Sequence, residues 1–116
     1  MKNLRKFCCG TLVVFLTSFA QTSFAQAPDL PHFKKNESYA SVRAKMIKAG
    51  WKPFHSKNAD TCSKGDSRCE GRPEMAACAG TGMANCKFLW KKNGKITAIC
   101  TVGEENATYD GICTYP

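Results

Sequence analysis

The cysteines constrain this chain more than any other feature. The sequence holds eight of them, and those in its second half are Cys62, Cys69, Cys78, Cys86, Cys100 and Cys113. An even number of cysteines in a short exported chain indicates disulfides. Zinc is the alternative, but the sequence contains no C-x-x-C pair and its only histidines are His32 and His55. We therefore expect no metal site, and nothing in the sequence indicates a cofactor.

The N-terminus predicts export. Basic residues at positions 2, 5 and 6 precede an apolar run from Phe7 to Phe19, which is shorter than the roughly 20 apolar residues needed to cross a membrane. Small residues follow this run, as at a signal-peptidase site. We expect residues 1–25 to be a signal peptide cleaved between Ala25 and Gln26, with a cut after Ala20 as the alternative. Cleavage lowers the formal net charge from +8 to +5 and leaves a periplasmic or secreted protein.

The remaining chain divides into a flexible lead-in, residues 26–37, and a single domain, residues 38–116. The hydrophobic core of a domain this small contributes only a small free energy of stabilisation. We expect bridges between neighbouring cysteines, 62 with 69, 78 with 86 and 100 with 113, each closing a short loop. Each would contribute about 2.5–3 kcal/mol in the chain-entropy model.

Helical spacing is clearest after position 38. Tyr39, Val42, Met46 and Ala49 fall on one face and predict an amphipathic helix, with Asn36 or Ser38 as its cap and Gly50 at its end. Pro73 suits a first helical position, and good helix formers follow it, so a short second helix is expected over residues 73–78.

The strand signal lies between Cys86 and Val102, where two apolar-rich runs flank Asn93-Gly94. That dipeptide favours a type I′ hairpin turn. The expected register pairs residue 90 with 97, 88 with 99 and 86 with 101, and a third strand is expected over residues 108–115. The predicted fold class is α+β, with an N-terminal amphipathic helix, a short second helix and a three-stranded antiparallel sheet, stapled by three disulfides.

Catalytic residues are scarce. His55 belongs to no H-x-x-x-H or comparable motif, and bridged cysteines leave no thiol nucleophile. Asp60, Asp66 and Glu70 do not follow the ligand pattern of a calcium loop. We therefore expect the protein not to be an enzyme.

The basic residues suggest a binding face. Lysines gather around the expected hairpin. Other basic residues lie on the first helix, and Lys52 follows that helix in the sequence. Solubility alone would explain them, but they would also steer the protein toward an anionic partner such as lipid headgroups, an envelope polymer or an acidic protein. Nucleic acid is not expected for an exported protein. The predicted partner-binding residues are Arg43, Lys45, Lys48, Lys87, Lys91, Lys92 and Lys95.

Two segments resemble a known family. Residues 39–53 read YASVRAKMIKAGWKP and residues 72–90 read RPEMAACAGTGMANCKFLW. They resemble the Y-x-x-V-R-x-x-L-I-x-x-G-W-x-P opening and the R-P-E-x-x-x-C-x-G-T-G-x-x-x-C-x-F-x-W segment of small exported proteobacterial envelope proteins of uncharacterised function, with Met46 at a position where relatives carry Leu. The resemblance implies an envelope location and a shared fold but no activity.

These observations favour a non-enzymatic binding protein of the bacterial cell envelope. The first alternative is an inhibitor or immunity protein that blocks a partner enzyme with loop 62–69 or the hairpin tip, whose preorganisation would lower the entropic cost of binding. A small hydrolase is the second alternative. Neither the partner nor the oligomeric state follows from the sequence.

Overall fold

The computed structural model describes Gly10 and residues 30–115. The predicted signal peptide, apart from Gly10, and the predicted cleavage site lie outside these residues. Within the described part of the chain, no helix is both long enough and apolar enough to span a membrane.

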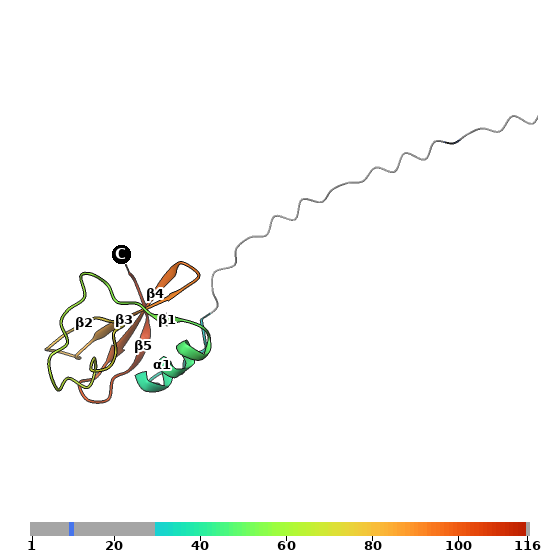
Figure 1. Ribbon diagram of the computed structural model, residues 1–116. Coiled ribbons are helices and arrows are strands. Elements are labelled where there is room, and N and C mark those ends of the chain that lie inside the picture. The colour runs from blue at the N-terminus through green and yellow to red at the C-terminus, as the bar shows by residue number, and fades with distance from the viewer. Residues whose placement is uncertain (1–9, 11–29, 116) are drawn as a thin grey trace, which may run out of the picture.

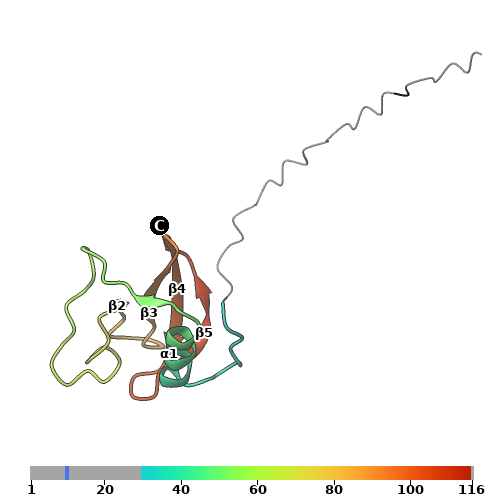
Figure 2. The same ribbon diagram turned by 45° about the vertical axis from the view of Figure 1, so that its right-hand side comes forward.

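The predicted first helix is confirmed. Helix α1 (Tyr39–Lys48) begins at Ser38, whose side chain accepts a hydrogen bond from the Ser41 backbone N–H, and it ends before Gly50, which has a φ of 85°. That left-handed conformation suits glycine, which lacks a Cβ. The helix lies across one face of the sheet (Figures 1 and 2).

The sheet corrects the predicted fold class. The described residues form one helix and a five-stranded antiparallel sheet, rather than two helices and three strands. The strands run in the order β1-β3-β4-β5, and β2 also pairs with β3. Their bounds are β1 (Lys52–Pro53), β2 (Met75–Cys78), β3 (Cys86–Lys92), β4 (Lys95–Val102) and β5 (Thr108–Cys113).

The predicted short helix over residues 73–78 is wrong, because β2 occupies most of this segment. Met75 pairs with Phe88 and Cys78 with Cys86, so β3 supplies hydrogen bonds that a helix of this length would have to form alone. An isolated helical turn is costly to nucleate, and an available sheet edge outweighs the helix propensity of Ala76 and Ala77.

The predicted hairpin is confirmed residue by residue. Strand β3 pairs with β4 so that Trp90 lies opposite Thr97, and the pairs 88–99 and 86–101 follow in the predicted register. Asn93 has a φ of 49° and Gly94 a φ of 77°, the left-handed conformations that a type I′ turn requires. Strand β4 then leads away from this tip to the turn at residues 103–107, at the opposite end of the sheet (Figure 1).

The disulfide pairing is also as predicted. Bonds join Cys62 to Cys69, Cys78 to Cys86 and Cys100 to Cys113. The last two bonds link paired strands, β2 to β3 and β4 to β5. The first bond closes a loop within residues 54–74, which bulge away from α1 (Figure 2).

The core lies between α1 and the sheet. Val42 and Met46 of the helix are fully buried, as are Phe88, Trp90 and Ile99 on the facing strands. On the opposite sheet face, Leu89 and Ala98 are buried as well.

The described part of the predicted lead-in, residues 30–37, contacts the domain. The Phe33 ring lies 5.0 Å from that of Tyr109, and Lys45 donates a hydrogen bond to the His32 carbonyl. This segment therefore runs alongside α1 and β5.

Candidate functional site

A buried carboxylate joins the two segments that carry the family resemblance. Glu74 is fully buried, and its Oε1 lies 2.6 Å from Nε of Arg43 on α1. The Tyr39 hydroxyl donates a hydrogen bond to the same oxygen at 3.0 Å and accepts one from Trp90 Nε1 at 3.3 Å. The guanidinium of Arg72 lies over the Tyr39 ring, 4.9 Å from its centre.

This cluster links α1 to the segment before β2 through charged and polar contacts. Burial and the charge of Glu74 raise the pKa of the Tyr39 hydroxyl, so it stays protonated. The hydrogen bond to Glu74 raises the pKa of the Arg43 guanidinium. Glu74 is shielded from solvent and its oxygens are engaged by Arg43 and Tyr39. These contacts explain why the two segments contain Tyr, Arg, Glu and Trp at these positions.

The structure divides the predicted partner-binding residues into three sets. Arg43 and Lys45 are neutralised by Glu74 and Glu37. Lys87 and Lys92 donate to the carbonyls of Thr114 and Ala49. Within residues 30–115, no ion pair involves the remaining members, Lys48, Lys91 and Lys95.

Four lysines without an ion pair in the described part of the chain lie at the hairpin end of the sheet, whereas Lys87 lies near the other end of β3. Lys52 of β1 lies directly opposite Lys91 of β3, and Lys92 lies directly opposite Lys95 across the hairpin. Because side chains alternate along a strand, the first pair lies on one face of the sheet and the second on the other.

Three of these lysines line a concave site at the edge of β3, which we call the lysine notch. The notch has a volume of about 440 Å³ and runs between β1 and the hairpin tip. Its lining residues are Gly50, Lys52, Pro53, Phe54, Lys91, Lys92, Asn93 and Gly94.

Sequence reasoning missed part of this notch. Lys52 follows the first helix but is not among the predicted partner-binding residues, and Phe54 has no predicted role in binding. The missing information was the pairing of β1 with β3, which joins residues far apart in the sequence through a strand of only two residues. A strand that short leaves no alternation pattern to read.

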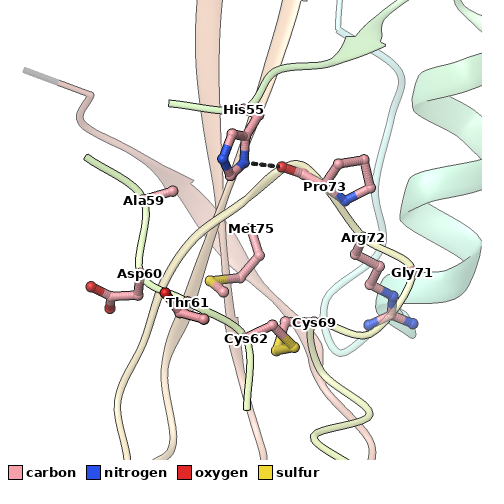
Figure 3. Close-up of a pocket in the computed structure, with 10 residues that line it drawn as sticks. All are labelled: His55, Ala59, Asp60, Thr61, Cys62, Cys69, Gly71, Arg72, Pro73 and Met75. Atoms are coloured by element: carbon pink, nitrogen blue, oxygen red, sulfur yellow. Dashed lines mark hydrogen bonds between the residues drawn. A yellow bond between two sulfur atoms is a disulfide. The ribbon is translucent and has the colours of Figure 1, made fainter. Parts of the chain in front are cut away.

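A second pocket lies beside the cysteine loop (Figure 3). It has a volume of about 540 Å³, and its lining includes His55, Asp60, the Cys62–Cys69 bridge and Met75. Nδ1 of His55 lies 3.0 Å from the Pro73 carbonyl oxygen, so this nitrogen carries the proton and donates it. Figure 3 shows the Asp60 carboxylate pointing away from the imidazole. The pocket therefore lacks the oriented acid and base that a hydrolytic site needs.

The acidic residues of the cysteine loop make local contacts. Asp66 forms an ion pair with Arg68 at 2.7 Å, and the hydrogen bond from Arg68 lowers the pKa of the Asp66 carboxyl. Glu70 accepts a hydrogen bond from the Gly65 backbone. Over residues 30–115, no three His, Cys, Asp or Glu side chains come together as a metal site.

Comparison with known proteins gives no match: no family model, curated protein or solved structure is similar to this chain. The resemblance to exported envelope proteins stays a prediction, and the functional interpretation has to come from the geometry.

Proposed function

We propose that this protein is a non-enzymatic binding protein of the bacterial cell envelope and that it holds an anionic partner at the lysine notch. The observation that carries the proposal is the direct opposition of Lys52 and Lys91 on paired strands, with no ion pair to either lysine in the described part of the chain.

Like charges on directly opposed strand residues are destabilising, by roughly 0.2–1 kcal/mol for each pair. This sheet contains two such pairs at the same end, Lys52 with Lys91 and Lys92 with Lys95. A bound anion would remove the repulsion and gain attraction from several cations at once. The opposed lysine pairs therefore destabilise the free protein and favour its complex with an anionic partner.

Charge is also segregated along the sheet. Lys52, Lys91, Lys92 and Lys95 lie at the hairpin end. Exposed Glu104 and Glu105 occupy the turn after β4 at the other end, where Lys87 is the one strand lysine among the described residues. Such a dipole orients a molecule as it approaches an anionic surface and raises the rate of productive encounter. The three disulfides fit the same setting, since disulfides persist in oxidising compartments such as the periplasm.

Co-sedimentation with envelope fragments tests the proposal. The oxidised domain should sediment with the fragments at low salt and be released at high salt, because salt screens exposed charges. The double variant Lys52→Gln/Lys91→Gln should lose most of this retention.

The matched control is Lys57→Gln/Lys64→Gln, which removes the same charge from exposed positions between β1 and β2. It should be retained nearly as well as the unmodified domain. Equal loss in the two variants would show that net charge, rather than the notch, governs retention. Retention that resists salt and depends on loop 62–69 would instead favour the inhibitor alternative.

A further inference from the structure

Two of the three lysines that line the lysine notch have their ammonium groups beside neutral partners. Lys92 Nζ lies 2.6 Å from the Ala49 carbonyl oxygen at the end of α1, and Lys91 Nζ lies 5.5 Å from the centre of the Phe54 ring. A carbonyl and an aromatic ring orient a cation without cancelling its charge. Two long side chains are thus partly ordered before any ligand arrives, which lowers the entropic cost of binding.

The type of basic side chain in the notch indicates which type of anion it binds. The cations that line the notch are all lysines, and no arginine is among its lining residues. Arginine presents a planar fork that matches a carboxylate, whereas lysine acts as a point charge with three donors that approach from separate directions. The separate ammonium groups of the opposed residues Lys52 and Lys91 suit a tetrahedral anion with several oxygens better than a planar one.

The size and charge of the notch also favour a tetrahedral anion over a planar one. Its volume of about 440 Å³ accommodates a compact group, and Gly50 and Gly94 line it without side chains. A phosphate monoester carries a charge of about −1.5 to −2 at neutral pH, and a carboxylate carries at most one. Of the two, only the phosphate approaches the charge that the opposed residues Lys52 and Lys91 present together.

We infer that the anionic group bound at the lysine notch is a phosphate monoester, carried either by a lipid headgroup or by a soluble molecule. This inference rests on the proposed function and names its ligand class. The ammonium groups of Lys52 and Lys91 approach the phosphate from the two paired strands.

Amide chemical shifts under titration test the inference with a defined probe. Glycerol 3-phosphate should shift the amide resonances of residues 50–52, 54 and 91–94, and it should bind at least fivefold more tightly than acetate at equal ionic strength. Lowering the pH from about 7.5 to about 5.5 should weaken this binding about fourfold, because the second pKa of a phosphate monoester is about 6. The Lys52→Gln/Lys91→Gln variant should lose the response, and Lys57→Gln/Lys64→Gln should keep it.

Vesicles distinguish the two sources of phosphate. Phosphatidylcholine vesicles that contain phosphatidic acid, a monoester lipid, should bind the domain more tightly than those that contain the diester phosphatidylglycerol. Strong vesicle binding would assign the phosphate to a lipid, and a response to glycerol 3-phosphate alone would assign it to a soluble molecule. Equal binding of phosphate and acetate, or no response to either of them, would overturn the inference. Salt-sensitive, lysine-dependent retention on envelope fragments would then still support the proposed function.

Discussion

The Glu74 carboxylate lies 2.6 Å from Nε of Arg43, a residue 31 positions away in the sequence. This ion pair ties α1 to the segment that enters β2, and it holds the hydroxyl of Tyr39 against the same oxygen. The contact joins parts of the chain that no local sequence pattern connects, so its loss should be measurable in the stability of the whole domain.

Glu74→Ala should destabilise the domain strongly, because it leaves Arg43 without its counter-charge and Tyr39 without its acceptor. Breaking a buried ion pair costs about 3–5 kcal/mol. Since 27% of the Arg43 side chain is exposed, we expect the lower end, about 3 kcal/mol. Urea unfolding followed by tryptophan fluorescence measures this free energy.

The control for this prediction replaces both partners with apolar side chains. Arg43→Met/Glu74→Leu leaves neither charge unpaired, so it should cost less than Glu74→Ala alone. A double variant as unstable as the sum of its single variants would show that the two side chains do not interact.

Thr101→Val should stabilise the domain. Thr101 is fully buried, and its Oγ1 has no hydrogen-bond partner among the described residues. Replacing an unpaired buried hydroxyl with a methyl group of similar shape removes a desolvation penalty, for a gain of about 1 kcal/mol. The midpoint of thermal unfolding reports the change. Thr97→Val, at a partly exposed position on the same strand face, is the matched control and should give a smaller gain.

Acid should weaken the start of α1 through Glu37. Its carboxylate accepts hydrogen bonds from Lys45, Ser41 and the Lys34 backbone, which lower the pKa of Glu37 from 4.5 to about 2. Because the folded pKa is the lower one, this stabilisation is complete above about pH 4.5 and disappears as the pH falls toward 2. The stability difference between the unmodified domain and Glu37→Gln, measured by urea unfolding, should therefore shrink over that range.

Ser41→Ala supplies an intermediate case for the same experiment. It keeps the Glu37 carboxylate but removes the donor 2.6 Å away, so the acid-dependent loss of stability should move to higher pH than in the unmodified domain. Identical acid dependence in all three proteins would contradict the assigned role of Glu37.

Removing the bond between β4 and β5 should show how far the covalent links support the fold. Cys100 and Cys113 are separated by 13 positions, and closing a loop of that length is worth about 3 kcal/mol in the chain-entropy model. Cys100→Ala/Cys113→Ala should lose about that much stability in urea, and reduction of all three bonds should unfold the domain. A well-folded molecule after full reduction would contradict this prediction.

The hairpin and the first helix could be predicted because neighbouring residues in the sequence determine each of them. Asn93-Gly94 requires left-handed backbone at two successive positions, and this requirement sets the register of β3 against β4. The apolar spacing from Tyr39 to Met46, bounded by Ser38 and Gly50, similarly defines α1. Neighbouring cysteines pair as predicted because the strands and the loop that carry them fold back locally.

The rest of the fold depends on distant partners. The residues of β2 favour a helix when taken alone, and only the edge of β3 makes them a strand. The same edge brings Lys52 opposite Lys91, so the lysine notch was visible in the sequence only as a surplus of positive charge. Composition indicated an anionic partner, whereas the position of its binding site required the sheet topology.

Strands β1 and β2 both pair with the same edge of β3, so the chain between them departs from that edge and returns to it. A segment with both ends fixed in this way tolerates changes of length, because lengthening a loop adds little closure entropy. An epitope tag or a fluorescent label could therefore be inserted between the exposed residues Lys64 and Gly65. Such a label would allow the protein to be followed in living cells without covering the hairpin end of the sheet.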